Sequence, residues 1–176
     1  MDNTSSYLSW GLYPSVTAHS VVRLSSFGAE LPSQQPLLAY GLGRSYGDVC
    51  LTDGGTLLDT TAMDHILAFD AEQGIVRAQA GLSFAKLLEI IVPRGWFLPV
   101  SPGTMYVTVG GAVANDIHGK NHHVAGTFGA HVRSFEVLRS NGDRFICTPD
   151  QHRELFCATI GGLGLKVTVL GKDTLF

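Results

Sequence analysis

The sequence predicts an α+β fold with mixed or antiparallel sheets and flanking helices, rather than a regular alternation of strands and helices. Patterns typical of short strands outnumber helical ones. Two pairs of strands are joined by hairpin signals, one at residues 70–74 and one at Asn141 and Gly142. The 176 residues are enough for one domain with a core of its own.

Each expected strand is a short run of apolar or β-branched residues that ends at glycine, proline or polar residues. The strands cover residues 20–24, 37–40, 56–59, 65–69, 75–80, 133–139, 144–147 and about 165–170. The runs that flank each turn signal pair with each other, which supplies the antiparallel part of the fold.

Two longer helices are expected. Ser83 can cap the first, because its hydroxyl can accept from free N–H groups in the first turn. An apolar stripe at helical spacing follows, at Phe84, Leu87, Leu88 and Ile91, and Pro93 and Gly95 end it. The second helix is expected to begin at Thr148, with Pro149 and Gln151 in its first turn, and to end at Gly161.

Composition excludes several classes of protein. A net charge of −3 provides no basic surface for nucleic acid. No run of 18 apolar residues is present, so we predict no membrane span. Cys50, Cys147 and Cys157 are widely spaced, and residues 1–20 are too polar for a signal peptide. These features predict a cytoplasmic protein with reduced cysteines.

The first candidate site is a glycine loop, residues 41–48, directly after the second strand. Its spacing, G-x-G-x-x-x-G, is neither the dinucleotide fingerprint G-x-G-x-x-G nor a Walker loop. Glycines nevertheless let successive backbone N–H groups point at one anion, and Ser45 adds a hydroxyl donor. An ordinary glycine-rich turn is the alternative.

The second candidate comprises Gly103 and Thr104 together with residues 108–111. Gly110 and Gly111 are expected to open a short helix of small residues, whose first N–H groups would remain free for an anion. A tight turn needed only for packing is the alternative. Two such glycine segments in one small domain favour a diphosphate ligand.

The third candidate is residues 115–123, which hold one acid, one lysine, two asparagines and three histidines. His118 and His122 stand four residues apart, as metal ligands can. We predict no metal, however, because Gly119 lies between them and no helical pattern holds them on one face. His122 and His123 are expected at the surface, whereas His118 is expected to face the reactive end of a cofactor.

These three motifs, in this order, resemble the FAD-binding domain of the vanillyl-alcohol oxidase type (PCMH-type, in FAD-linked oxidases). Within that family they are most similar to the decaprenylphosphoryl-ribose oxidases. The resemblance covers about residues 35–165 and is most specific in residues 118–123. It implies two sub-lobes, at about residues 18–98 and 103–176, that hold FAD between them. The boundary is expected near Pro99 and Pro102.

The resemblance also implies the residues of the site. Those expected to contact FAD are Gly41, Leu42, Gly43, Arg44, Ser45, Tyr46, Gly47, Asp48, Gly103, Thr104, Thr108, Val109, Gly110, Gly111, Asn115, Asp116, Ile117 and His118. Tyr46 and His118 are expected near the isoalloxazine as catalytic residues. In relatives that bind FAD covalently a histidine often stands in the place of Arg44, so non-covalent FAD is expected here.

The implied reaction is oxidation of a sugar CH–OH group, with hydride transfer to the flavin. The implied substrate is a sugar or a polyprenylphosphoryl sugar. Family members continue into a substrate domain, whereas residues 166–176 fit the family poorly, so a truncated or frame-shifted gene without that domain is expected. A non-catalytic module that binds a nucleotide or flavin, and an FAD domain of the sugar-lactone oxidase type, are the alternatives.

Overall fold

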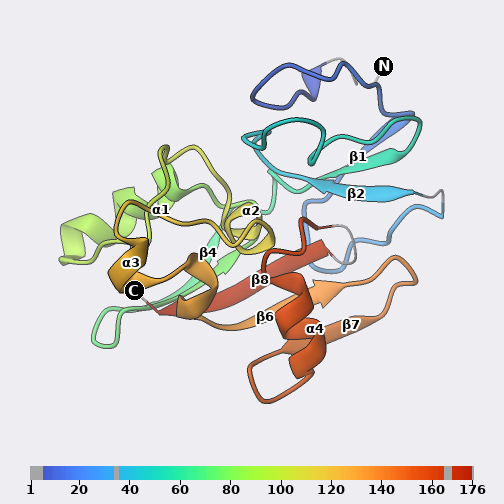
Figure 1. Cartoon of the computed structure of the whole chain (residues 1–176). Coiled ribbons are helices and arrows are strands. Elements are labelled where there is room, and N and C mark those ends of the chain that lie inside the picture. Colours follow the sequence, from blue (N-terminus) through green and yellow to red (C-terminus); the bar gives the residue numbers. More distant parts are fainter. Residues whose placement is uncertain (1–5, 34–35, 165–167, 176) are drawn as a thin grey trace.

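The computed structural model describes residues 6–33, 36–164 and 168–175 and contains two sheets (Figure 1). The three-stranded sheet is parallel, in the order β1 (Ser20–Arg23), β3 (Thr56–Asp59), β2 (Leu37–Tyr40). The five-stranded sheet is antiparallel, in the order β4 (Ile66–Asp70), β5 (Ile75–Gln79), β8 (Thr168–Leu175), β6 (Val132–Leu138), β7 (Arg144–Cys147). Both sheets with their helices confirm the predicted α+β class.

In the parallel sheet, β3 is the central strand and is buried along its whole length. Ser20 and Leu37 both pair with Thr56, so the two outer strands run in register on either side of β3. β2 leads directly into the first glycine loop, which therefore lies at the carboxyl edge of this sheet. That edge is where α/β sheets commonly bind ligands.

The antiparallel sheet contains both predicted hairpins, β4–β5 and β6–β7, and β8 lies between them (Figure 1). The β6–β7 turn is made by Asn141 and by Gly142, whose φ is 86°. The final strand differs from the prediction, because it extends to Leu175. Residues 165–167 of the predicted strand lie outside the described residues.

Helix α1 (Phe84–Ile91) confirms the first predicted helix. The Ser83 hydroxyl accepts from the Lys86 N–H at 3.2 Å, and the apolar stripe faces the core. The helix passes into a 3₁₀ turn, η2 (Val92–Arg94), which ends at Gly95 with φ 83°. Short helices α2 (Val109–Ala114) and α3 (His122–Ala125) and a second 3₁₀ turn, η3 (Phe128–His131), follow.

The second predicted helix begins later than expected. The Thr148 hydroxyl accepts from the N–H groups of Asp150 and Gln151, as a cap would. His152 then takes a left-handed conformation with φ 52°, so the helical hydrogen bonds start only after it. Helix α4 therefore spans Arg153–Thr159.

The main core lies between the antiparallel sheet and its helices. Phe84 on α1 contacts Phe128 at 5.4 Å between ring centroids, and Phe156 on α4 stacks on Phe135 of β6 at 4.9 Å. A smaller cluster joins the two sheets, because it combines Leu58 of β3 with Leu138 of β6.

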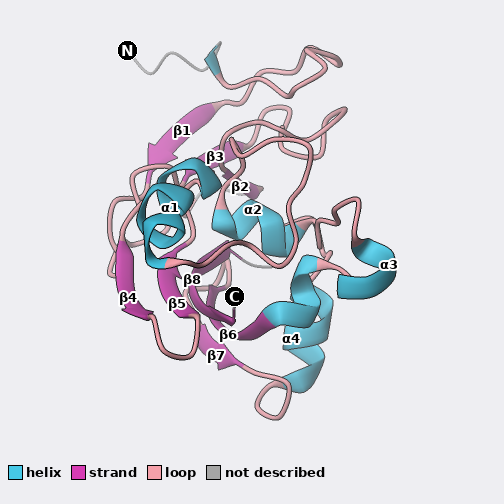
Figure 2. Cartoon of the chain, turned by 90° about the vertical axis from the view of Figure 1, so that its left-hand side faces the viewer, coloured by secondary structure: helices cyan, strands magenta, loops and turns pink. Residues whose placement is uncertain are grey.

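The boundary between the two sheets falls at residues 60–65 and not near Pro99 and Pro102. β4, β5 and α1 belong with the antiparallel sheet, because β5 pairs with β8 and α1 packs into the main core. Figure 2 shows α2 at the junction between the two sheets, as does Figure 1.

Within the described residues, none of the helices has the length and apolar character that crossing a membrane requires.

Candidate functional site

A cleft of about 790 Å³ opens between the two sheets. Pockets for sizeable ligands commonly measure roughly 300–1,000 Å³. The predicted residues that line it are Gly41, Leu42, Gly43, Arg44, Ser45, Tyr46, Gly103, Thr104, Thr108, Gly110, Gly111, Asn115, Ile117 and His118. The fold thus brings all three sequence motifs to one cavity. Gly47, Asp48, Val109 and Asp116 are not among its lining residues.

The first glycine loop has unused hydrogen-bond donors. Within the described part of the chain, the backbone N–H groups of residues 42–44 and 46–48 have no protein acceptor. Gly43 is buried, and an unpaired buried N–H group is rare unless a ligand or water satisfies it. The loop therefore suits an anion that accepts several N–H groups at once.

The conformation of this loop is set by contacts on two sides. A Cβ atom at Gly41 would lie 2.7 Å from the Thr108 hydroxyl oxygen, so the loop packs directly on the N-cap of α2. Gly43 has a φ of 62°, and a Cβ there would collide with the Tyr40 hydroxyl and the Leu8 carbonyl. Only glycine fits either place without movement of its neighbours.

The N-terminus of α2 differs from the prediction, because its N–H groups are not free. Val109 N–H donates to the Leu82 carbonyl at 2.8 Å, and Gly110 N–H to the Ala80 carbonyl at 2.7 Å. Gly111 N–H donates to the Thr108 hydroxyl at 3.1 Å. The prediction of free N–H groups at this turn was therefore wrong, since the chain before α1 supplies two of the acceptors.

Gly110 serves packing instead. A Cβ atom at this position would lie 2.9 Å from the Ala80 side chain, so the absence of a side chain lets α2 approach the end of β5. In the neighbouring loop, the N–H groups of Gly103 and Thr104 have no acceptor among the described residues. The second motif therefore offers donors at residues 103–104 rather than at the helix itself.

The polar segment divides into residues that face the cleft and residues that hold the segment in place. His118 lines the cleft and is exposed. Asp116 takes a φ of 42°, and its Oδ1 accepts from Gly129 N–H at 2.8 Å. The prediction that Asp116 faces the cofactor is not supported by this arrangement, because its carboxylate is turned toward the start of η3.

Residues after His118 anchor the segment to the loop beside it. Asn121 donates to the Pro99 carbonyl at 2.9 Å, and a Cβ at Gly119 would lie 2.7 Å from the Ser101 carbonyl. The His118 and His122 rings are 5.7 Å apart, and His122 Nδ1 lies 3.1 Å from the Gly119 carbonyl. Among the described residues, no three potential metal ligands cluster here or elsewhere.

The charge of the cleft favours an anionic ligand. Arg44 is the one lining residue with a permanent charge, and no described residue of the lining is acidic. Burial raises the pKa of both the Tyr40 hydroxyl and the Cys50 thiol, so both stay neutral at neutral pH. The guanidinium of Arg44 lies 5.2 Å from the Trp10 ring, a cation–π distance.

The sequence did not indicate several lining residues. They include Trp10, Ala39, Tyr40, Val49, Cys50, Thr60, Ala80, Ala114, Leu163 and Gly164. Tyr40 could have been inferred from its place directly before the glycine loop. Trp10 lies in a segment without a recognisable pattern. Ala80 and Thr60 carry no chemical signal at all.

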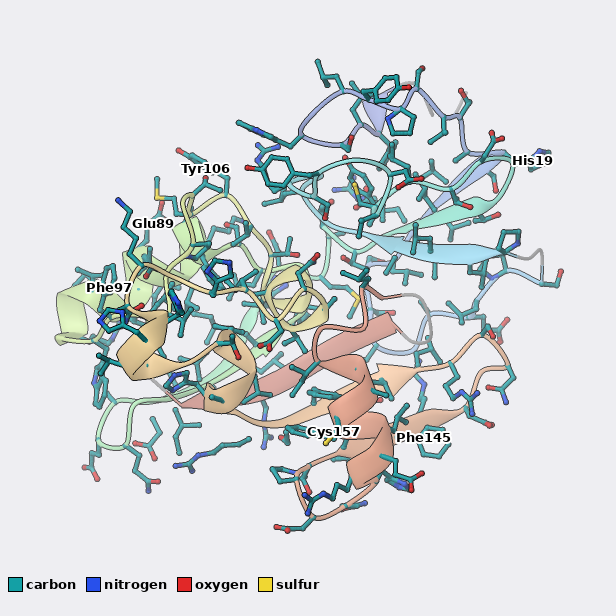
Figure 3. All side chains as sticks on the ribbon, in the orientation of Figure 1. His19, Glu89, Phe97, Tyr106, Phe145 and Cys157 are labelled. Atoms are coloured by element: carbon teal, nitrogen blue, oxygen red, sulfur yellow. The ribbon has the colours of Figure 1, made fainter. Side chains whose placement is uncertain are left out.

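Two exposed residues lie outside the cleft lining. Figure 3 shows Tyr106 projecting outward from the loop before α2, and it is exposed. Cys157 lies on α4, on the part of the molecule remote from the first glycine loop (Figure 3). Cys50 and Cys147 are buried, and all three cysteines are free.

The comparisons with known proteins agree with this geometry. Residues 18–148 match the FAD binding domain family. The chain is 43% identical over 158 residues to a decaprenylphosphoryl-β-D-ribose oxidase from Mycolicibacterium smegmatis, covering 89% of this chain and 33% of that protein. It is also 28% identical to cytokinin dehydrogenase 7 from rice, Oryza sativa subsp. japonica. That match covers 87% of this chain and 30% of the rice protein.

A D-lactate dehydrogenase from Anaerostipes hadrus is 31% identical over 90 residues, which cover 51% of this chain and 19% of that enzyme. The chain thus spans about one third or less of the length of these relatives. The described cleft contains unpaired N–H groups and one cationic side chain, Arg44. These groups suit the diphosphate of FAD, the cofactor for which the family is named. This chain belongs to the FAD binding domain family, and FAD is its cofactor.

Proposed function

We propose that this chain is the flavin-binding part of an oxidoreductase that holds FAD without a covalent bond and oxidises a CH–OH group of a polyprenylphosphoryl sugar. The observation that carries the proposal is the cleft that unites the glycine loop, Arg44 and His118. The 43% identity to an enzyme named decaprenylphosphoryl-β-D-ribose oxidase supports the substrate class.

The first glycine loop and Arg44 are suited to hold the cofactor's diphosphate. The loop contributes unpaired N–H groups, and Arg44 contributes a positive charge and planar N–H donors. A guanidinium that stays protonated is not a nucleophile, so Arg44 cannot make the covalent flavin bond that a histidine in its place makes. Bound FAD supplies the hydride acceptor, and the protein supplies orientation and charge.

Tyr46 and His118 are proposed as the catalytic residues of this chain. Both line the cleft, and both are exposed to an incoming substrate, with 77% of Tyr46 accessible. A neutral His118 imidazole can accept the proton of a substrate hydroxyl, which is the usual role of histidine at such sites. The Tyr46 hydroxyl can donate to or accept from a sugar oxygen.

Flavin absorbance tests the cofactor part of the proposal. The purified chain is mixed with FAD, passed through a gel-filtration column and scanned between about 350 and 500 nm, the flavin absorption region. We expect flavin to elute with the protein and to enter the supernatant after acid precipitation. Flavin that stays on the precipitated polypeptide would contradict non-covalent binding.

Anaerobic bleaching of the flavin tests the substrate. A soluble short-chain polyprenylphosphoryl-β-D-ribose is added to the FAD-loaded chain, with the free sugar ribose as control. Loss of flavin absorbance with the phosphoryl sugar, and its absence in the His118→Ala variant, is expected. Flavin that stays oxidised would show that this chain by itself binds flavin but is incomplete as a catalyst, as a non-catalytic flavin-binding module would be.

A further inference from the structure

The first glycine loop is covered by a stretch of chain that lies outside the region matched by the family. Residues 6–13, here called the N-terminal segment, precede the match, which begins at residue 18. Figures 1 and 2 both show this segment running across the end of the molecule beside the three-stranded sheet. Its path is determined by side-chain and backbone contacts that the sequence pattern did not reveal.

The beginning of the segment is anchored to the parallel sheet. Tyr7 donates its hydroxyl hydrogen to Asp59 Oδ2 at 2.8 Å, at the end of β3. Its ring meets Tyr40 edge-on, with centroids 5.0 Å apart. Tyr40 in turn donates to the Leu8 carbonyl at 2.6 Å. These contacts connect the segment to the ends of two strands, so its position is fixed relative to the sheet.

The middle of the segment contacts the glycine loop itself. Trp10 N–H donates to the Ser45 carbonyl at 3.0 Å, and the Trp10 ring lies under the Arg44 guanidinium at 5.2 Å. Arg44 also donates to the Leu42 carbonyl at 2.9 Å. Trp10 and Arg44 are both part of the cleft lining. The segment therefore holds the loop at Ser45 and Arg44, next to residues whose N–H groups have no acceptor in the described chain.

We propose that Trp10 is a positioning residue of the flavin site, which acts through Arg44 to keep the glycine loop in its anion-binding conformation. A loop with few internal hydrogen bonds loses conformational freedom when it binds a ligand, and an aromatic ring that already orients Arg44 reduces that loss. The role of Trp10 in FAD binding rests on the proposed function. Its role in holding the loop does not.

Limited proteolysis tests the loop contact without any flavin. Trypsin cleaves after arginine, so the bond between Arg44 and Ser45 reports how often the loop opens. We expect Trp10→Ala to speed this cleavage about fivefold, the factor that corresponds to one cation–π contact at an exposed site. Cleavage after Arg139, in the β6–β7 hairpin, is the internal reference and should not change.

Leu12→Ala is the matched control, because Leu12 is 66% exposed in the same segment and does not line the cleft. Trp10→Phe keeps an aromatic face and should give an intermediate rate. An unchanged rate at Arg44 in Trp10→Ala, or an equal increase in Leu12→Ala, would overturn the proposal.

A double-mutant cycle on FAD affinity tests the route through Arg44. Trp10→Ala alone is expected to weaken FAD binding about fivefold. In an Arg44→Met background the same change should have almost no further effect, since there is no cation left to position. Additive losses would mean that Trp10 contacts the flavin directly and would overturn the indirect role. If the unmodified chain binds no FAD, the proposed function fails, and the proteolysis result alone decides the role of Trp10.

Discussion

The two glycine segments of this chain look alike in sequence and serve different purposes in the fold. In the first, residues 41–47, the N–H groups of most residues have no acceptor within the described chain. In the second, residues 108–111, the N–H groups from Val109 onward donate to Leu82, Ala80 and Thr108. The first leaves several N–H donors available to a ligand, and the second lets a helix approach a strand closely. Glycine content alone does not separate these roles, whereas the hydrogen-bond partners do.

The largest expected effect separates packing from binding at Gly110. Gly110→Val is expected to lower the free energy of unfolding by about 3 kcal/mol, because the side chain would overlap Ala80. Urea denaturation without FAD measures this change. Gly103→Val is the control, since no heavy atom lies within 4 Å of a Cβ there. If the Gly110→Val protein has normal stability but does not bind FAD, Gly110 is needed for ligand binding and not for packing.

The next largest effect is expected from alanine substitutions at two glycines of the first loop, Gly43 and Gly47. Gly43 and Gly47 have φ values of 62° and 60°, so alanine at either position costs about 1–2 kcal/mol of backbone energy. Only at Gly43 would a Cβ also strike Tyr40 and Leu8. We therefore expect Gly43→Ala to destabilise the protein by about 1 kcal/mol more than Gly47→Ala and to weaken FAD binding further.

Thermal unfolding and flavin titration of the two variants check this order. Equal stability of Gly43→Ala and Gly47→Ala would show that the contact of the loop with Tyr40 and Leu8 relaxes without loss. The N-terminal segment would then not constrain the loop at that point.

Local signals allowed much of the fold to be predicted. Ser83 and the apolar stripe after it fixed α1, and Asn141 with Gly142 marked the β6–β7 turn. These features depend on residues a few positions apart, so the local sequence contains them. The first glycine loop was predicted from its glycine spacing, although the contacts with Thr108, Tyr40 and Leu8 that hold it were not.

Features set by distant contacts could not be predicted. The acceptors that use the N–H groups of α2 belong to Leu82 and Ala80, nearly thirty residues earlier in the chain. The contact between Trp10 and Arg44 joins segments that no pattern connects. The sheet boundary at residues 60–65 depends on β5 pairing with β8, at the opposite end of the chain. The start of α4 was also missed, because His152 takes a left-handed conformation that the sequence pattern did not indicate.

A smaller effect is expected at the cap between the two glycine segments. Thr108→Ala removes the acceptor of the Gly111 N–H and should cost about 1 kcal/mol of stability, as for other N-caps. Thr108→Ser keeps the hydroxyl and should restore most of it. Because Thr108 also contacts Gly41, both glycine segments depend on this side chain. If serine fails to restore stability in thermal unfolding, the methyl contact with Gly41 is the more important one.

The smallest expected effect concerns Tyr7, which anchors the N-terminal segment beside the first glycine loop. Burial, together with the hydrogen bond to Asp59 and the negative charge of Asp59, raises the pKa of Tyr7 to about 12, from an ordinary value near 10. The protonated hydroxyl is the form that donates to Asp59. Its contribution to stability is therefore complete below about pH 10 and is lost as pH rises through about 12.

Tyr7→Phe keeps the ring against Tyr40 and removes only the hydroxyl. We expect wild type to be more stable than this variant by up to about 1 kcal/mol below pH 10, the usual net value of one hydrogen bond. The difference should shrink between about pH 10 and 12. Urea denaturation of both proteins across this range cancels the titration of groups that they share. A difference in stability that does not change with pH would mean that Tyr7 anchors the N-terminal segment through its ring and not through Asp59. The second glycine segment makes none of these contacts, so we expect the Tyr7→Phe substitution to leave it unchanged in either case.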